Sequence, residues 1–505
     1  MPCPPADLGP SGGPRPGEAA QVGQAFGRAR TGVRWFLVEQ QVGVYNFSAY
    51  ERMLADLEAA GVGAYWILAH GNPLYGSSES PGNPISAQQR EGFARFAVAM
   101  IAHFRGRDVI WEVWNEPNAG ASWHNSSGTG HVNSTQYAAL LNTVGAAVRG
   151  DPRTHSEYLV GPATSGVDLQ FIAAVGEAGA LSWLDAVSVH PYRAGGPESV
   201  LVDYAELRAL LHTIRGAPTA ILSGEWGWAS CHFPNGTASA CHSGGGGVGQ
   251  VVSEHEQASR LARQWLINDA ANVSLSIWYD WINDGSSPQD AENNYGTVYP
   301  GWVSHNGSHP RVEKLTYKAA HTLQQLLGSQ EPLGAVCNTS LGEYAVRYGN
   351  TNVSAVASRW AVWQATPATL NAKCDHRQWM CCRYANGTII PHCATKEGCE
   401  ARGCCWDPNP HIPRMWCSHP NPPPPPPLPS NVCRLPVHLS GCFDVYGLLG
   451  GSPTAKVCGD ESGFGVRVVQ GKFALTTDPQ YLVPTASDAR SWDWSKDGGI
   501  GSFCV

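Results

Sequence analysis

The sequence predicts an α/β protein in which a (β/α)8 barrel precedes a smaller β-sandwich. Strand-like and helix-like segments alternate between residues 32 and 327, as a barrel of parallel strands requires. Two of the strand-like runs end in a glutamate that is flanked by tryptophans. From Gly334 onward the pattern changes to short apolar runs separated by turn residues, which is typical of antiparallel sheets.

Length and charge limit the classes of protein that fit. A chain of 505 residues is expected to hold two or three domains. The net charge of −8 and the lack of a basic run argue against a nucleic-acid partner. No apolar run in the sequence reaches the roughly 20 residues that a membrane span needs. We expect a monomer.

Cysteines and glycosylation sequons predict an oxidising compartment. Thirteen of the 16 cysteines lie at or beyond Cys337, and nine Asn-x-Ser/Thr sequons are spread over the chain. We therefore expect a glycoprotein that is secreted or lies in the endomembrane lumen. The sequons start at Asn46, Asn125, Asn133, Asn235, Asn272, Asn306, Asn338, Asn352 and Asn386.

The first residues lack the features of a secretory signal. Met1–Pro5 has neither a charged segment nor an apolar one, and residues 1–17 are rich in Pro and Gly, which predicts disorder. No run before residue 17 is apolar enough for a barrel strand. We expect that the signal peptide and the first barrel strand are missing from this sequence.

The expected barrel covers residues 18–328 with seven strands. Ser48 with Glu51, and Ser86 with Gln89, have the spacing of capping boxes that begin helices. The expected strands are Gly32–Val38, Ala64–Leu68, the run from Val109, Tyr158–Gly161, Ala186–His190, Ala220–Glu225 and Leu275–Trp281. The expected helices include Ser48–Ala60, Thr135–Arg149, Ser199–Arg215, Glu254–Asp269 and Lys314–Leu327.

The first of the two glutamates ends the run Val109–Asn118. Pro117 has no N–H to continue a strand, so Glu116 should lie at the C-terminal tip, where the active sites of parallel barrels are found. An ordinary exposed glutamate at a strand end is the alternative interpretation. Glu112 lies within the strand, and we interpret it as structural.

The second glutamate, Glu225, ends another apolar run, Ala220–Trp228. Two strand-end carboxylates beside aromatic rings are what glycoside hydrolysis needs, because one acts as the acid and the other as nucleophile or base. The sequence implies no metal and no organic cofactor. Three acidic residues follow the last strand, but their spacing does not specify a cation site: Asp280, Asp284 and Glu292.

Four motifs resemble glycoside hydrolase clan A, the retaining (β/α)8-barrel enzymes. Trp114–Pro117 resembles the acid/base motif of the clan, and Gly224–Gly227 resembles its nucleophile strand. Asp185–Arg193 and Ser276–Trp281 resemble its sixth and eighth strands. The resemblance spans roughly residues 30–328 and is nearest to families 39 and 5. It implies that Glu116 is the acid/base and Glu225 the nucleophile.

The resemblance also implies substrate contacts. Asn115 would contact the sugar 2-hydroxyl. Arg34 would keep the nucleophile ionised, although a structural ion pair explains Arg34 nearly as well. The further expected contacts are His190 and Tyr192 near the nucleophile, Trp278 as a stacking platform, and Tyr75.

A Cys-dense module, residues 374–420, follows the first part of the sandwich. Cys399–Trp406 resembles the C-x4-C-C-aromatic core of a trefoil (P-type) domain, and Cys417 fits its last cysteine. Cys393 lies too close to Cys399 for the usual spacing, so the pairing stays open. An unrelated disulfide knot is the alternative.

The segments around this module are expected to belong together. Residues 421–430 predict a stiff polyproline linker. We expect one sandwich built from residues 334–372 and 433–505, with the module inserted, and three successive modules are the alternative. In the barrel, Cys231 and Cys241 are expected to form a disulfide in the loop after Glu225.

These observations predict a retaining O-glycoside hydrolase that cleaves β-linked sugars in a polysaccharide or glycoconjugate. A transglycosylase is expected instead if water is kept from the covalent intermediate. A non-catalytic carbohydrate-binding or adhesion protein is the alternative of a different class.

Overall fold

The computed structural model covers residues 1–505. The structure describes residues 7–10, 17–78, 82–120, 122–123, 133–193, 195–230, 251–285, 290–302, 310–338, 342–349, 359–365, 374–375, 405–406, 417–420, 442–459, 466–471 and 478–484. None of the helices in these segments is long and apolar enough to cross a bilayer.

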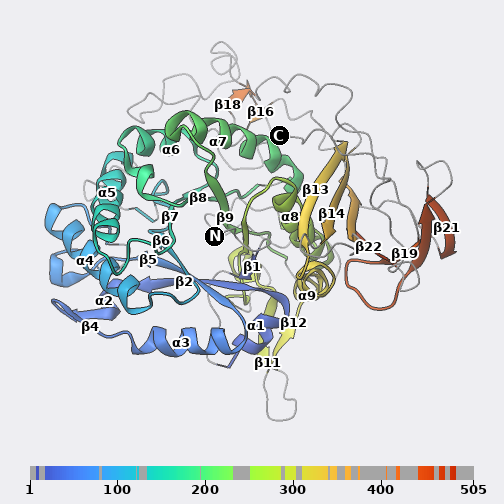
Figure 1. Ribbon diagram of the computed structural model, residues 1–505, viewed down its shortest axis with the longest axis horizontal. Coiled ribbons are helices and arrows are strands. Elements are labelled where there is room, and N and C mark those ends of the chain that lie inside the picture. Colours follow the sequence, from blue (N-terminus) through green and yellow to red (C-terminus); the bar gives the residue numbers. More distant parts are fainter. Residues whose placement is uncertain are drawn as a thin grey trace.

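Eight parallel strands between Asp7 and Trp278 form a curled sheet (Figure 1). Their order in the sheet is β1-β10-β9-β8-β7-β6-β5-β2, so neighbours follow chain order except that the first strand, β1, lies beside the last, β10. This is the arrangement expected of a βα-barrel. The strands are β1 (Asp7–Pro10), β2 (Arg28–Arg34), β5 (Gly63–Ala69), β6 (Val109–Val113), β7 (Leu159–Ser165), β8 (Ala186–His190), β9 (Ala220–Trp226) and β10 (Leu275–Trp278).

Helices cover the outside of this sheet (Figure 1). The helix α4 begins with the expected capping box of Ser86 and Gln89. The other expected box, Ser48 with Glu51, is wrong: Phe47 is the N-cap of α3 and makes no side-chain cap bond, and Glu51 instead pairs with Arg107. The helices are α1 (Ala19–Ala25), α2 (Trp35–Val38), α3 (Ser48–Ala59), α4 (Ala87–His103), α5 (Ser134–Gly150), α6 (Leu169–Glu177), α7 (Val200–Arg215), α8 (Glu254–Ala270) and α9 (Leu315–Leu327).

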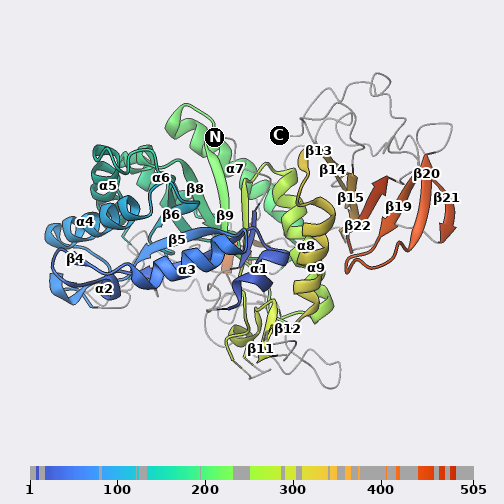
Figure 2. The ribbon, with the colours of Figure 1, turned by 60° about the horizontal axis from the view of Figure 1, so that its bottom comes forward.

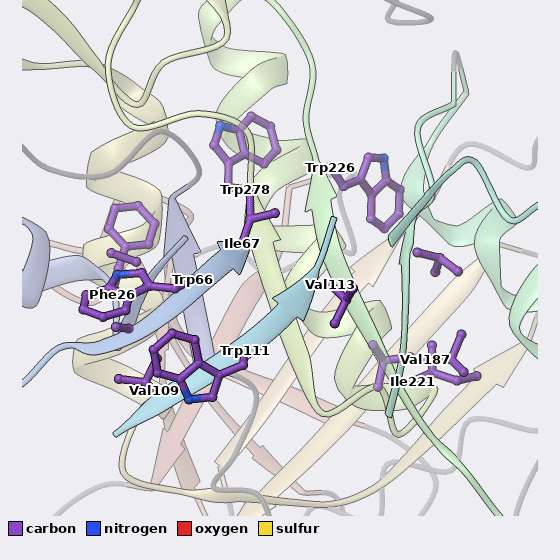
Figure 3. Close-up of a cluster of buried hydrophobic side chains, with 14 of the residues drawn as sticks. Phe26, Trp66, Ile67, Val109, Trp111, Val113, Val187, Ile221, Trp226 and Trp278 are labelled. Atoms are coloured by element: carbon purple, nitrogen blue, oxygen red, sulfur yellow. The ribbon is translucent and has the colours of Figure 1, made fainter. Parts of the chain in front are cut away.

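The two faces of the parallel sheet bury different side chains, because successive residues of a strand alternate between faces. The outer face packs large apolar residues against the helices, among them Trp66, Trp111 and Ile221 (Figure 3). The inner face carries a separate apolar cluster that fills the lower part of the barrel. This inner cluster consists of Tyr65, Val160, Ala186, Leu222, Leu275 and Ile277, with the partly buried Ile110 packed against it.

Two expectations about the first strands are wrong. Residues 1–17 do include a strand, β1, which pairs in parallel with β10 from Asp7 opposite Leu275 to Pro10 opposite Trp278. Four residues with one apolar side chain gave no strand signal. The next strand begins at Arg28, earlier than expected, and the aromatic run Trp35–Val38 is a short helix.

Two small two-stranded sheets lie outside the parallel sheet among the described residues. One is the hairpin of β3 (Glu39–Gln41) and β4 (Val44–Tyr45), which follows α2. The other pairs β11 (Val298–Trp302) with β12 (Arg311–Glu313) just before α9.

A seven-stranded antiparallel sheet follows the barrel, in the order β13-β14-β15-β22-β19-β20-β21. Strands from both segments that flank the Cys-rich region join in it, because β15 pairs with β22. Among the residues that the structure describes, these strands form one sheet, and the second sheet of the expected sandwich is not found. The strands are β13 (Glu331–Asn338), β14 (Glu343–Gly349), β15 (Arg359–Gln364), β19 (Cys442–Tyr446), β20 (Ala455–Gly459), β21 (Val466–Gly471) and β22 (Gln480–Pro484).

Little of the Cys-rich module lies within the described residues. Three short strands, β16 (Cys374–Asp375), β18 (Cys417–Pro420) and β17 (Cys405–Trp406), form a small antiparallel sheet in that order. The expected trefoil pairing, the polyproline linker and the Cys231–Cys241 disulfide fall outside the described residues and stay predictions.

Helix α8 joins the barrel to the antiparallel sheet, and Figure 2 shows it between the two together with α9. Polar groups are buried at this junction. The Tyr348 hydroxyl donates to Asp269 Oδ2 at 2.7 Å, and the Trp363 indole donates to Glu198 Oε1 at 2.9 Å. Glu198 also accepts two hydrogen bonds from Arg263, at 2.7 and 2.8 Å. Burial raises the pKa of Asp269 to about 7.

The Asp269 carboxyl should make stability depend on pH. Because its pKa is raised on folding, its proton favours the folded state fully below about pH 4, and this contribution is lost as pH rises through about 7. Unfolding free energy should therefore fall by up to about 1.4 kcal/mol per pH unit in this window. Urea unfolding from pH 4.5 to 7.5 should show this slope in the wild type.

The Asp269→Asn variant should lose that part of the slope, whereas Asp56→Asn on the exposed face of α3 should keep it. An unchanged slope in Asp269→Asn would contradict the burial of an ionisable carboxyl at the junction.

Candidate active site

The C-terminal tips of three barrel strands bring Glu116, His190 and Glu225 together. One ligand-type atom from each of these side chains lies within 4.8 Å of the other two. Glu116 follows β6, His190 ends β8, and Glu225 lies near the end of β9. A pair of carboxylates this close fits the separation of about 5–5.5 Å in retaining glycosidases and not the 6.5–9.5 Å of inverting ones.

A register shift turns Glu225 toward the barrel axis. Ser276 pairs with Ser223 and Trp278 with Trp226, so β9 holds one residue more than β10 between these pairs. Such a bulge re-aims a side chain that regular alternation would send to the other face. Both carboxylate oxygens of Glu225 are then bonded: Oε2 accepts from Arg30 Nη1 at 2.8 Å, and Oε1 from the Tyr192 hydroxyl at 2.9 Å.

The glycines on either side of Glu225 are required by close contacts. A Cβ at Gly224 would lie 2.3 Å from the Ser188 hydroxyl oxygen, and a Cβ at Gly227 would lie 2.1 Å from the Tyr279 carbonyl oxygen. Only glycine fits at such distances. The Gly-Glu-Trp-Gly motif therefore reflects how tightly β9 packs beside β8 and β10.

Glu116 is held by an unusual backbone conformation. Trp114 and Glu116 have φ values of 69° and 45°, which non-glycine residues rarely adopt. The Glu116 N–H donates to the Ala163 carbonyl oxygen at 2.9 Å, which ties the turn to the tip of β7. Strain of this kind costs on the order of 1–3 kcal/mol per residue and is found at functional sites.

His190 links Glu116 to Arg30. Its Nε2 lies 3.3 Å from Arg30 Nη2. Its Nδ1 lies 2.9 Å from Glu116 Oε1, and the hydrogen bond between them places a donor on the Glu116 carboxylate. Burial raises the pKa of the Glu116 carboxyl, but the hydrogen bond from His190 and the charge of Arg30 outweigh burial, so its pKa lies below the usual range.

Arg30 is the buried cation of the site. Its Nε and Nη2 donate to Glu112 Oε2 at 3.0 and 2.5 Å, and its Nη1 binds Glu225. Nη2 also donates to Asn115 Oδ1 at 2.6 Å, which orients the Asn115 amide. Burial alone would lower the pKa of Arg30, but the carboxylates of Glu112 and Glu225 raise it above its usual range.

Glu112 supports Arg30 from inside the barrel, as a structural residue would. It is fully buried, and its Oε1 accepts a short hydrogen bond from the Tyr65 hydroxyl. The Tyr65 oxygen lies 3.0 Å from Ser188 Oγ. Glu112, Tyr65 and Ser188 form a polar layer between the carboxylate pair and the apolar inner cluster.

The structure corrects the position of the expected arginine. Arg34 is exposed, and its side chain has no ion pair with any residue that the structure describes. Arg30, four residues earlier on the same strand face, binds Glu225 instead. The expected strand began too late because Arg28 and Arg30 weakened its apolar pattern, although both are paired with carboxylates, Asp108 and Glu112.

Two expected sugar contacts lie in packed surroundings. Trp278 is fully buried, and its indole N–H donates to the Tyr295 carbonyl oxygen at 3.1 Å. Tyr75 stacks on Trp35 with ring centres 4.8 Å apart, and its hydroxyl donates to Glu39 at 2.7 Å. Both side chains stabilise the loops of the site and present no free ring face.

Tyr279, which the sequence analysis missed, offers a partly exposed ring. Its ring centre lies 6.5 Å from that of Tyr192 and 5.3 Å from that of Tyr295. Leu275 and Ile277 point inward, so alternation along β10 directs the odd-numbered residues to the axis and Trp278 to the outer face. Alternation of side chains along the strand therefore predicts Tyr279, and not Trp278, on the side of the barrel axis.

The acidic residues beyond β10 do not converge on a cation site. Among the described residues, Glu116, His190 and Glu225 are the one set of three such ligands that does converge. The guanidinium of Arg30, 2.8 Å from Glu225, opposes a cation there. Asp280 is buried, and its Oδ1 has no hydrogen-bond partner in the described part of the chain.

Stability measurements can separate the two arginines. Arg30→Met would leave Glu112 buried without its cation, so unfolding free energy should fall by about 3–5 kcal/mol. Arg34→Met removes an exposed side chain that has no ion pair among the described residues, and it should change the unfolding free energy by no more than about 0.5 kcal/mol. Guanidinium chloride unfolding measures both, and equal losses would contradict this assignment.

Solved structures with a similar fold were found, although no similar sequence was. No protein-family model and no curated protein sequence matches the chain. The chain is similar to a family 39 glycoside hydrolase from Bacteroides cellulosilyticus WH2, with a TM-score of 0.61, 18% identity, and 95% of this chain and 81% of that one covered.

Two further structures are similar over nearly their whole length. They are a glucosidase from Croceicoccus marinus, with a TM-score of 0.55, 14% identity, and 95% of this chain and 96% of that one covered, and a GH30 endoxylanase from Clostridium papyrosolvens C71, with a TM-score of 0.50, 11% identity and 96% and 97% covered. At such identities the likeness shows a shared fold: the chain folds as these glycoside hydrolases do.

Proposed function

We propose that the protein is a retaining O-glycoside hydrolase that cleaves β-linked sugars of a polysaccharide or glycoconjugate. The observation that carries this proposal is the pair of carboxylates from Glu116 and Glu225, with oxygens within 4.8 Å at the C-terminal end of the barrel. This spacing leaves room for a sugar carbon, and not for a water as well, between the two groups.

Glu225 is the proposed nucleophile. Its carboxylate attacks the anomeric carbon while the bond to the leaving oxygen breaks, and Glu116 gives its proton to that oxygen. This step forms a glycosyl ester on Glu225. In the second step Glu116 takes a proton from water, the water oxygen bonds to the anomeric carbon, and Glu225 leaves as a carboxylate.

The surrounding groups orient this chemistry. Arg30 and Tyr192 each hold one oxygen of Glu225, which fixes the plane of the attacking carboxylate. Asn115 turns its amide N–H₂ away from Arg30, as a donor for the sugar 2-hydroxyl. Tyr279 provides an apolar ring for the sugar face. The expected secretion or lumenal location, the monomeric state and the trefoil-like module belong to the same proposal.

Leaving-group chemistry can separate the roles of the two glutamates. Glu116→Gln should lower the turnover of an alkyl or phenyl β-glycoside by about 10²–10⁴-fold, because the leaving oxygen needs a proton. With a 2,4-dinitrophenyl β-glycoside, which needs none, the same variant should release a rapid burst of phenolate and then slow down. Glu225→Gln should give neither burst nor turnover.

Stopped-flow absorbance measures the phenolate burst and the turnover over a panel of aryl glycosides with epimeric sugars. Glu177→Gln, at the exposed end of α6, is the matched control. A folded Glu225→Gln protein with normal turnover would overturn the assignment. Tight sugar binding with no turnover of any substrate would favour the non-catalytic binding protein.

The pH profile tests the role of His190. The acid must carry its proton in the first step, and the hydrogen bond from His190 keeps the pKa of Glu116 below its usual range. The alkaline limb of kcat/KM should therefore lie on the acidic side of neutrality. Replacing His190 by Phe removes the bond, so the pKa of Glu116 should rise and the alkaline limb should move to higher pH. A profile that stays in place would contradict this role.

A further inference from the structure

The mouth of the site carries a cation that the proposed mechanism does not use. Arg34 is the last residue of β2, and strand register from Arg28 to Arg34 is continuous against Gly63–Ala69. Arg30, Gly32 and Arg34 therefore share one face. Contact of Arg30 with Glu225 shows that this face is turned to the active site.

The space beneath Arg34 is open. A Cβ added at Gly32 would have no heavy atom within 4 Å, unlike one at Gly224 or Gly227. Gly32 lies between Arg30, which is fully engaged with buried partners, and Arg34, whose guanidinium has no ion pair among the described residues. A side chain at Gly32 would thus meet no neighbour, and the guanidinium of Arg34 follows two residues later on the same face.

A second nitrogen-bearing side chain stands beside Arg34. His70 directly follows Ala69, the register partner of Arg34, and has a φ of 69°. Its ring packs edge-on against Phe36 at 6.2 Å, and its buried Nδ1 has no hydrogen-bond partner in the described part of the chain. Burial and the charge of Arg34 lower the pKa of His70, so the ring is neutral near pH 7 and acts as a polar neighbour.

Charge is distributed unevenly across the site. Asp284 and Glu292 lie beyond β10, and their charges act on Tyr279, whereas burial raises the pKa of the neighbouring Asp280 well above its usual range. Arg34 lies on β2, and β2 and β10 are not neighbours in the sheet order. An anionic group on a bound sugar would be repelled from the β10 side and attracted to the β2 side.

We infer that Arg34, at the C-terminal end of β2, forms a subsite for the carboxylate or sulfate group of an anionic sugar. A guanidinium is suited to either group because it donates two parallel hydrogen bonds to a planar or tetrahedral oxyanion. The inference rests on the proposed function, since it assigns the substrate class of that same site. Uronic acids and sulfated sugars present the two possible sources of the charge.

Equilibrium binding tests this inference without requiring turnover. Calorimetry would compare methyl β-glucuronide and methyl β-glucoside 6-sulfate with methyl β-glucoside, and the galacto-configured set likewise, on the full chain carrying Glu116→Gln. In at least one set an anionic member should bind about tenfold more tightly than its neutral partner, the effect of roughly one charge-assisted hydrogen bond. The better anionic ligand identifies carboxylate or sulfate as the source.

Substitution at Arg34 is the decisive control. Adding Arg34→Gln should remove the preference and leave affinity for the neutral glycoside unchanged, whereas Arg52→Gln on the exposed face of α3 should preserve it. Equal binding of charged and neutral sugars, or a preference that survives Arg34→Gln, would overturn the subsite. Turnover of dinitrophenyl glycosides is measured separately, so loss of the subsite is distinguishable from failure of the two-glutamate mechanism.

Discussion

A single guanidinium, that of Arg30, has to satisfy two carboxylates at the centre of the barrel. Its side chain is 1% exposed, as against 0% for Glu112 and 14% for Glu225. Removing these charges from water costs several kcal/mol per ion, which is recovered only if the geometry of the hydrogen bonds is good. Arg30 meets this condition with bonds to Glu112, Glu225, Asn115 and His190, so each of these four side chains is positioned by the same group.

This constraint explains why the two glutamates differ. Glu225 faces the guanidinium directly and has both oxygens bonded, which suits an ionised nucleophile. Glu116 is linked to Arg30 through the imidazole of His190. The backbone is adapted to this arrangement at both tips: an extra residue in β9 turns Glu225 inward, and left-handed residues after β6 place Glu116 beside it.

The sequence could predict the elements whose signals are local. Apolar runs and strand-ending residues located β8 and β9, and the two glutamates followed because Pro117 and the surrounding tryptophans mark strand ends. Arg30 could not be found in this way, since its place in the core depends on Glu112, which lies 82 positions away. Trp278 was preferred over Tyr279 because ring type was weighed and strand parity was not. The short strand β1 has no local signal and depends on its pairing with β10.

The distance between the two carboxylates decides the stereochemical outcome of the reaction, so the anomeric configuration of the first product is the most direct test. Proton NMR of an aryl β-glycoside digest, recorded before the free sugar equilibrates, shows which anomer forms first. Double displacement through Glu225 predicts the β-anomer, with retention at the anomeric carbon. An initial α-anomer would mean that water attacks directly, and it would contradict the role of Glu225 as nucleophile.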